Sequence, residues 1–204
     1  MDKSTLSYYS SDAENIADRY ESVDSSLSKI FYEAFEKGGK ILDIGCGSGR
    51  DLAELSLQGF NVYGVDPTPQ FISIAQRIHP ELKGRISIGN LPEIKKSTDG
   101  SFDGILCSAV LMHLEEVVLL KAILNIKNLL KFKGRLLISV PEKRDDEVNN
   151  ERDQYGRLFK KYSSEFLNTE FKKQGFTLIQ SWNNTDSMNR VGVEWLTQLY
   201  ELSN

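Results

Sequence analysis

A glycine-rich turn between an apolar run and a helical segment is the feature that most constrains this fold. Residues 40–51 read KILDIGCGSGRD, so the apolar run ends directly before Gly45, Gly47 and Gly49. Glycines let the backbone turn sharply and approach a ligand without a Cβ atom in the way. A helix after the turn directs unpaired N–H groups and the positive end of its dipole at that same place. The segment therefore predicts a strand–loop–helix unit with a ligand at its turn.

A second strand supports this interpretation and indicates the kind of ligand. The apolar run Asn61–Val65 ends in Asp66. An acidic residue at the tip of the second strand of a βαβ unit is placed to accept hydrogen bonds from ribose hydroxyls. Together, the two strand ends predict a nucleoside-bearing cofactor on a Rossmann-like sheet.

The loop itself distinguishes between cofactors. Its order is G-x-G-x-G after Asp43, and Arg50 stands where the third glycine of a dinucleotide motif would be. An aspartate here repels a pyrophosphate and suits a cationic group such as an α-amino group. S-adenosylmethionine (SAM) has an ammonium, a sulfonium and a ribose, and no phosphate. On these residues, Asp43 to Gly49 and Asp66, the chain resembles the class I SAM-dependent methyltransferases.

The rest of the chain fits an α/β fold. Alternating strand and helix patterns from Lys40 to about Val140 predict a largely parallel sheet. We expect a seven-stranded, mostly parallel sheet with helices on both faces, an antiparallel C-terminal edge hairpin and an N-terminal helical lid. The expected strands are Ile41–Ile44, Asn61–Val65, Arg85–Ile88, Phe102–Cys107, Arg135–Val140, Phe176–Trp182 and Val191–Tyr200. The crossover helices are expected to begin near Ser48, Thr68 and Glu115, and Leu111–Lys131 to form one helical segment that Gly134 caps.

We predict a single domain over residues 1–204, with a helical cap (1–38), a SAM-binding core (39–140) and a substrate-side part (141–204). Apolar residues at three- and four-residue steps predict one or two helices over Ser10–Lys37. More than half of residues 141–162 are charged, which predicts a solvated, mobile connector. Ser163 is expected to cap a helix that ends at Gly175, before the C-terminal hairpin with its loop at Asn183–Arg190.

The resemblance implies which residues bind the donor. Asp43 would attract the methionine ammonium, Gly45 and Gly47 would contact the methionine part through main-chain atoms, and Asp66 would hold the ribose. The implied cofactor contacts are Asp43, Gly45, Cys46, Gly47, Gly49, Asp66, Pro67, Asn90, Leu91, Ser108 and Ala109. S-adenosylhomocysteine (SAH) would be the product.

The third motif departs from the family pattern. Many members carry an acidic residue shortly before Leu-Pro, whereas this chain has Asn90 directly before Leu91 and Pro92. The side chain of Asn90 can accept a hydrogen bond from the adenine amino group through its carbonyl oxygen. The alternative is a turn asparagine that caps the next segment.

His113 is the candidate general base. It follows the expected strand Phe102–Cys107 and the loop residues Ser108 and Ala109, at the carboxyl edge where ligands of open α/β sheets bind. As neutral imidazole it can take a proton from a substrate hydroxyl, amine or acid near pH 7. The alternative is a histidine that caps or packs the start of the following helix.

Tyr9, Tyr20, Arg157 and Lys161 are the candidate substrate-side residues. A wider candidate anion site consists of Arg144, Arg152, Arg157, Lys160 and Lys161, with Tyr155 and Phe159 between them. Residues 155–162 also resemble, weakly, a segment of the tRNA wobble-uridine methyltransferases. Acidic neighbours such as Asp145, Asp146 and Glu151 argue against a strong nucleic-acid platform.

Composition limits the remaining choices. The net charge of −4 gives no global basic surface, and the first twenty residues have no signal-peptide pattern, so we expect a cytoplasmic monomer or weak homodimer without a membrane partner. Two cysteines, Cys46 and Cys107, suggest neither a disulfide scaffold nor a metal site. The expected function is methyl transfer from SAM to a small molecule by in-line displacement. The alternatives are an RNA-modifying methyltransferase, a SAM-binding protein without catalysis, and an NAD-dependent oxidoreductase, which Asp43 and Arg50 disfavour.

Overall fold

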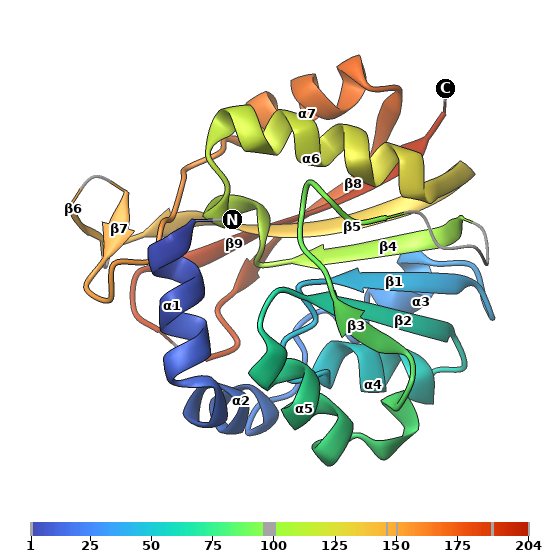
Figure 1. Ribbon diagram of the computed structural model, residues 1–204. Coiled ribbons are helices and arrows are strands. Elements are labelled where there is room, and N and C mark those ends of the chain that lie inside the picture. The colour runs from blue at the N-terminus through green and yellow to red at the C-terminus, as the bar shows by residue number, and fades with distance from the viewer. Residues whose placement is uncertain (1, 96–100, 146, 150, 189, 204) are drawn as a thin grey trace.

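Strands and helices alternate along the chain, as the sequence pattern predicts. The computed structural model describes residues 2–95, 101–145, 147–149, 151–188 and 190–203 (Figure 1). The α-helices are α1 (Lys3–Ser11), α2 (Ala13–Glu21), α3 (Phe31–Ala34), α4 (Arg50–Leu57), α5 (Pro69–Ile78), α6 (Glu116–Leu129) and α7 (Ser164–Lys173), with 3₁₀ turns η1 (Pro80–Leu82) and η2 (Leu111–His113). The strands are β1 (Lys40–Ile44), β2 (Asn61–Asp66), β3 (Ile86–Ile88), β4 (Phe102–Ser108), β5 (Leu130–Arg144), β6 (Glu147–Asn149), β7 (Arg152–Asp153), β8 (Phe176–Thr185) and β9 (Val193–Leu202).

The main sheet has seven strands in the order β3-β2-β1-β4-β5-β9-β8. Strands β1 to β5 pair in parallel, β9 runs antiparallel to β5, and β8 runs antiparallel to β9. The expected seven-stranded, mostly parallel sheet with a C-terminal edge hairpin is confirmed. Because β8 is again parallel to β5, its end lies at the same edge as the ends of β1 to β5.

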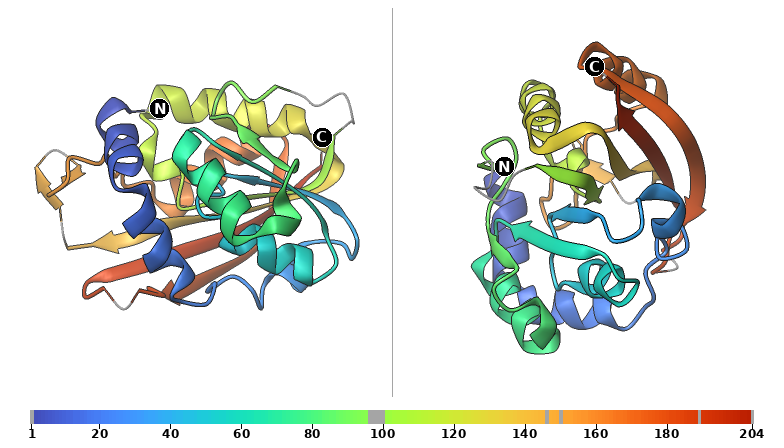
Figure 2. Two further views of the ribbon diagram at one scale, coloured as in Figure 1. Left: turned by 60° about the horizontal axis from the view of Figure 1, so that its bottom comes forward. Right: turned by 90° about the vertical axis from the view of Figure 1, so that its right-hand side faces the viewer.

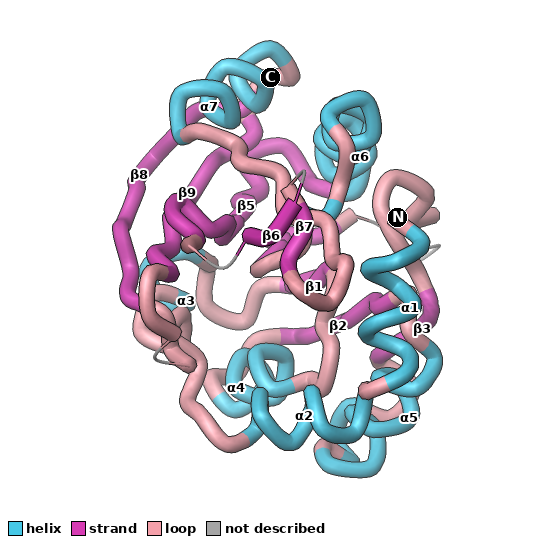
Figure 3. Tube along the Cα trace, turned by 90° about the vertical axis from the view of Figure 1, so that its left-hand side faces the viewer, coloured by secondary structure: helices cyan, strands magenta, loops and turns pink. Residues whose placement is uncertain are grey.

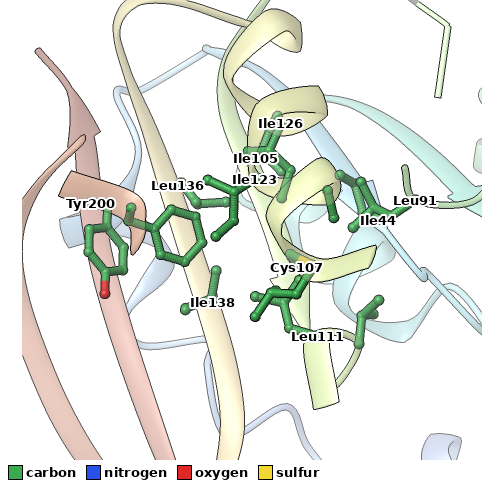
Figure 4. Close-up of a cluster of buried hydrophobic side chains, with 14 of the residues drawn as sticks. Ile44, Leu91, Ile105, Cys107, Leu111, Ile123, Ile126, Leu136, Ile138 and Tyr200 are labelled. Carbon is green, nitrogen blue, oxygen red and sulfur yellow. The ribbon is translucent and has the colours of Figure 1, made fainter. Parts of the chain in front are cut away.

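Helices cover both faces of this sheet, with α6 and α7 on one face and α4 and α5 on the other (Figures 1 and 2). On β1, Leu42 and Ile44 belong to the cluster under α6, while Ile41 belongs to the cluster under α4, as the two-residue period of a strand requires. The cluster under α6 joins Ile123 and Ile126 to residues of β4, β5 and β9 (Figure 4). Full burial of each such side chain contributes about 1.5–3 kcal/mol.

The segment Leu111–Lys131 is not one helix. The turn η2 precedes α6, and α6 ends at Leu129, where the chain passes directly into β5. The left-handed residue is Lys133 (φ 62°), so the prediction that Gly134 caps the helix is wrong. Gly134 is needed for space, because a Cβ atom there would lie 2.8 Å from the carbonyl oxygen of Lys131.

The charged segment 141–162 is not a solvated connector. Strand β5 continues to Arg144, and Leu158, Phe159 and Tyr162 are buried. The Lys160 amide donates to the Met112 carbonyl (2.8 Å), and the Tyr162 hydroxyl donates to the Leu114 carbonyl (2.6 Å). These contacts fix the segment against η2 although its apolar residues follow no helix or strand period.

The N-terminal helices lie at the edge where the parallel strands end, beside the β6–β7 hairpin (Figures 1 and 3). The Asp2 carboxylate caps α1 by accepting from the Thr5 amide (2.9 Å) and also pairs with Arg152 (2.9 Å). Ile16 and Ala17 of α2 pack on Phe71 of α5. The expected helical N-terminal region is confirmed, although α1 begins upstream of Ser10. Within the residues that the structure describes, no helix is long and apolar enough to cross a bilayer.

Candidate functional site

A large cleft opens at the carboxyl ends of the parallel strands. Its wall combines the loops after β1, β2 and β4 with α1, α2, the β8–β9 loop, Arg157 and Phe159. Counting its open mouth, the cleft encloses ≈ 1330 Å³ of empty space. Its wall combines charged, aromatic and main-chain groups, as is typical of small-molecule sites.

The glycines of the β1–α4 loop have different tasks. Gly45 (φ 77°), Gly47 (φ 52°) and Gly49 (φ 89°) all adopt left-handed backbone conformations. Gly47 faces the cleft, where the nearest described atom to a Cβ placed on it would be a ring carbon of Tyr20 at 4.0 Å. A Cβ on Gly49 would instead meet Leu82 at 3.0 Å, on the side away from the cleft. Gly49 thus also has a packing role, and its cofactor contact stays a prediction, while Gly45, Cys46 and Gly47 line the cleft.

Asp66 connects the end of β2 with this loop. Its carboxylate accepts hydrogen bonds from the amides of Gly47 (3.0 Å) and Thr68 (2.8 Å). Burial raises the pKa of this carboxyl, and the two amide bonds oppose the rise. Each carboxylate oxygen has a second lone pair. Asp66 can therefore hold the loop and accept from a ribose at the same time.

Asp43 lies beside Asp66 and is also buried. Burial raises the pKa of its carboxyl well above the usual range, and the charges of Asp51 and Asp66 raise it further, while Arg50 opposes them. All four residues line the cleft. Such a cluster of acids in a protein interior is stabilised by a bound cation.

The loop after β4 brings Ser108 and Ala109 to the cleft, as predicted. Ala109 has φ 57°, a left-handed conformation that costs a residue with a Cβ atom about 1 kcal/mol or more. Its amide donates to the Ser139 carbonyl (3.0 Å), and the hydroxyls of Ser108 and Ser139 lie 2.9 Å apart. These bonds hold the backbone of β4 and β5 together at the cleft wall.

Asn90 and Leu91 lie outside the main cleft. They line a small neighbouring depression together with Gly45 and Pro67, and Pro67 also lines the main cleft. The side-chain amide nitrogen of Asn90 donates to the Leu91 main-chain carbonyl (3.1 Å). The main-chain carbonyl of Asn90 accepts from the Glu93 amide (2.9 Å). These are the contacts of a turn asparagine, and an adenine-binding role stays a prediction.

His113 is buried at the cleft wall, 2 % exposed. Its Nδ1 lies 2.6 Å from the Leu158 carbonyl oxygen, which can only accept, so Nδ1 carries the proton. The lone pair of Nε2 then accepts from the Tyr9 hydroxyl at 3.2 Å. Burial lowers the pKa of His113 to about 4. The imidazole is thus neutral, and Tyr9 stands between its lone pair and the cleft, so a direct general-base role stays a prediction.

The structure brings three of the four predicted substrate-side residues to the cleft. Tyr9, Tyr20 and Arg157 line it, whereas Lys161 is exposed and lies outside its wall. Arg157 Nη2 and Nε donate to one carboxylate oxygen of Asp153 (2.6 and 2.8 Å), and Nη1 donates to the Tyr9 hydroxyl (3.3 Å).

Other wall residues were not singled out from the sequence. Asp186 in the β8–β9 loop accepts from Arg190 Nη2 (2.6 Å) and from the Trp195 indole (2.9 Å). All three line the cleft. From the sequence we expect a hairpin loop here. The one signal that could have identified these wall residues is a set of charged and aromatic residues next to a strand end at the ligand-binding edge.

Fold and cleft together define the class of protein. This architecture is that of class I SAM-dependent methyltransferases. It has an acidic residue before a glycine loop, an acidic residue at the end of β2, and a parallel sheet extended by an antiparallel hairpin. A family model described as "Methyltransferase domain" matches residues 16–181. The chain belongs to this methyltransferase family.

Curated relatives match only part of their own length. A magnesium-protoporphyrin O-methyltransferase of Rhodobacter capsulatus is 35% identical over 77 residues, which is 37% of this chain and 34% of the relative. A ubiquinone biosynthesis O-methyltransferase of Rickettsia conorii is 29% identical over 120 residues, 59% of this chain and 38% of the relative. The matched segments thus span about a third of each relative.

Solved structures match over nearly the whole chain. The 1,6-didemethyltoxoflavin-N1-methyltransferase of Burkholderia thailandensis, with bound 1,6-didemethyltoxoflavin and SAH, has a TM-score of 0.77 at 23% identity and covers 98% of this chain and 88% of its own. A TehB-like SAM-dependent methyltransferase of Corynebacterium glutamicum has a TM-score of 0.63 at 26% identity, covering 93% and 97%. The [4+2]-cyclase SpnF has a TM-score of 0.73 at 15% identity, covering 96% and 94%. Because a cyclase shares the fold, the site must decide the chemistry.

Proposed function

We propose that this protein binds SAM and transfers its methyl group to a small-molecule acceptor by in-line displacement. One observation carries the proposal: the buried acids Asp43 and Asp66 at the glycine loop share a single cleft with Tyr9, His113 and Arg157. The two acids at the glycine loop suit a cationic nucleoside. Tyr9, His113 and Arg157 provide a polar wall for an acceptor. The named methyltransferases among the similar proteins support this choice of activity.

The residues around the glycine loop, which form the donor end of the cleft, fit SAM. Asp43 and Asp66 repel a pyrophosphate and attract the ammonium and sulfonium of SAM. Gly47 leaves open space at the loop, which allows the backbone to approach a ligand. The free lone pairs of Asp66 match ribose hydroxyls. The same features disfavour NAD, whose pyrophosphate would face the acidic cluster.

Bound SAM would supply a methyl group made electrophilic by the sulfonium. The chain's own contribution is to align the acceptor and to exclude water, and such positioning alone can lower a barrier by ~7–11 kcal/mol. Tyr9 of α1 and Tyr20 of α2 are the residues that these two helices contribute to the cleft wall. The neutral His113 holds the Tyr9 hydroxyl in place.

The contacts of the basic residues favour a small acceptor over RNA. Arg157 pairs with Asp153, Lys160 lies 3.5 Å from a carboxylate oxygen of Glu115, and Lys173 lies 2.6 Å from Glu170. Non-specific nucleic-acid binding needs cations that can neutralise phosphates. Three of the described cations between residues 157 and 173, namely Arg157, Lys160 and Lys173, thus have a carboxylate close by.

Calorimetric titration with SAM, SAH and NAD tests the cofactor. We expect SAM and SAH to bind and NAD to fail. Asp66→Ala should weaken SAH binding at least tenfold, about 1.4 kcal/mol, because it removes the ribose acceptor and releases Gly47. Asp24→Ala is the matched control, since Asp24 is an exposed acid outside the cleft wall. Unchanged affinity in Asp66→Ala would reject the ribose assignment.

Formation of SAH with a panel of acceptors tests catalysis. Acceptor-dependent SAH release, with the methylated product identified by mass spectrometry, is the expected result. A protein that binds SAM as a sensor or structural subunit would bind SAH equally well and release none with any acceptor, including bulk tRNA.

A further inference from the structure

The charged residues of the cleft are separated by sign. The donor end, beside β1 and β2, contains Asp43, Asp51 and Asp66 against Arg50. The opposite end contains Arg144, Arg157 and Arg190, with Asp153 and Asp186 as ion-pair partners of the last two. These arginines come from the end of β5, the segment after β7 and the β8–β9 loop, so they lie on the other half of the sheet.

The arginines are close enough to act on the same neighbours. The charges of Arg157 and Arg144 both oppose protonation of His113, and the charge of Arg157 also acts on Arg190. The Arg144 guanidinium carbon lies 3.5 Å from the centre of the Phe159 ring, and that of Arg157 lies 5.0 Å from the same centre. Arg157 thus occupies the middle of a basic cluster with an aromatic ring in it.

The Arg157 and Arg190 guanidinium groups have donors to offer to a ligand. A guanidinium carries five N–H groups. Among the described residues, Asp153 and Tyr9 accept three from Arg157, and Asp186 accepts two from Arg190 through the Nε and Nη2 atoms. Arg157 is only 9% exposed. Each side-chain nitrogen of Arg157 already donates one hydrogen bond, and its two remaining N–H groups are available to an acceptor group in the cleft.

We propose that the methyl acceptor is a small organic acid whose carboxylate is bound by Arg157 between Arg144 and Arg190. This inference rests on the proposed methyltransferase function and names its substrate class. The planar fork of a guanidinium matches the two oxygens of a carboxylate. With a cationic donor at the acidic end and an anionic acceptor at the basic end, the cleft's own charges set which molecule occupies which end.

The test compares benzoate with its neutral isostere benzamide, using calorimetry on protein saturated with SAH. We expect benzoate to bind at least tenfold more tightly. This preference should fall at least tenfold in Arg144→Gln and in the double variant Asp153→Asn/Arg157→Gln. The double variant removes both charges of the buried pair, because Arg157→Gln alone would leave Asp153 uncompensated. Arg157→Lys keeps the charge without the fork and should retain part of the preference.

Lys121→Gln, an exposed cation on α6 outside the cleft, is the control that should keep the full preference. SAH affinity should stay within twofold of wild type in all variants, which shows that they are folded. Equal binding of the two probes, or no binding of either, overturns the proposal. So does a benzoate preference that the arginine variants leave unchanged.

Two further outcomes separate this proposal from others. Tighter binding of phenyl phosphate than of benzoate, with the same arginine dependence, would assign the site to phosphate esters and overturn the carboxylate assignment. If SAH itself does not bind, the proposed methyltransferase function fails. The benzoate comparison is then made on the free protein, where an arginine-dependent preference still supports the acid-binding site.

Discussion

The imidazole of His113 is held between a carbonyl acceptor and a hydroxyl donor, which fixes both its tautomer and its neutral state. Leu158 and Tyr9 supply these partners, and both are far from His113 in the sequence. The sequence therefore identifies a histidine at the correct strand end but offers no way to infer its burial. The structure shows a buried, neutral imidazole that accepts from the Tyr9 hydroxyl, and its role as a general base stays a prediction.

The lowered pKa of His113 predicts a loss of stability in mild acid. The unfolded chain binds a proton near the ordinary value of 6.5, whereas the folded chain binds it only near 4. Between these values the unfolded state holds more protons, so the free energy of unfolding falls as pH decreases, by about 3 kcal/mol in total. Urea unfolding of wild type and His113→Gln from pH 7 to pH 4 measures this, and the variant should lose less stability. Parallel pH curves would show that folding does not shift the pKa of His113.

Tyr9 should matter more for turnover than for cofactor binding. Its hydroxyl donates to His113 and accepts from Arg157, at the acceptor end of the cleft. We expect Tyr9→Phe to lower kcat/KM at least tenfold, about 1.4 kcal/mol of transition-state stabilisation, because acceptor alignment is lost. Steady-state kinetics with the acceptor found by screening and titration with SAH measure the two effects. Tyr8→Phe, outside the cleft wall, should behave as wild type. An equal loss in SAH affinity for Tyr9→Phe would show that Tyr9 belongs to the donor site instead.

At the scale of elements, local patterns predicted the sheet and missed the parts held by distant contacts. Apolar runs with turn residues identified the seven main strands, and the Ser163 cap of α7 was correct because capping is local: the hydroxyl accepts from the Phe166 amide. The segment 141–162 was misjudged because its buried residues have no period. Its fixed position comes from partners such as Thr5 and Met112, which no local pattern reveals.

Thr5 is the residue through which α1 holds this segment. Its hydroxyl accepts from the Leu158 amide (2.9 Å) and donates to Asp2 (2.8 Å), and its side chain is fully buried. Thr5→Val keeps the shape and removes both bonds, which leaves the Leu158 amide unsatisfied at a cost of about 1–3 kcal/mol. We expect faster hydrogen exchange in α1 and at residues 157–159, measured by mass spectrometry. Thr5→Ser, which keeps the hydroxyl, should exchange like wild type, and unchanged exchange in Thr5→Val would show that α1 is held by other contacts.

At the scale of the whole molecule, the arrangement of charge carries more information than its sum. The net charge of −4 excludes a global basic surface, yet the cleft has an acidic end and a basic end. The acidic end was predictable because Asp43 and Asp66 lie near the carboxyl ends of β1 and β2 at fixed motif positions. The basic end was only partly predictable, because Arg144, Arg157 and Arg190 come from three separate segments that the antiparallel hairpin and the 141–162 segment bring together.

This polarity predicts that SAM binds more weakly as pH decreases. Burial raises the pKa values of Asp43 and Asp66, so these carboxyls take up protons at a higher pH than usual in the free protein. A bound cation favours the ionised form and lowers both pKa values, so binding releases protons and affinity rises with pH until both groups are ionised. SAM carries a sulfonium charge that SAH lacks, so the slope should be steeper for SAM. Titration calorimetry at several pH values, in buffers of different ionisation enthalpy, measures affinity and proton release together. Asp43→Asn should bind more weakly with a shallower slope, and proton uptake on binding by wild type would contradict the acidic donor end.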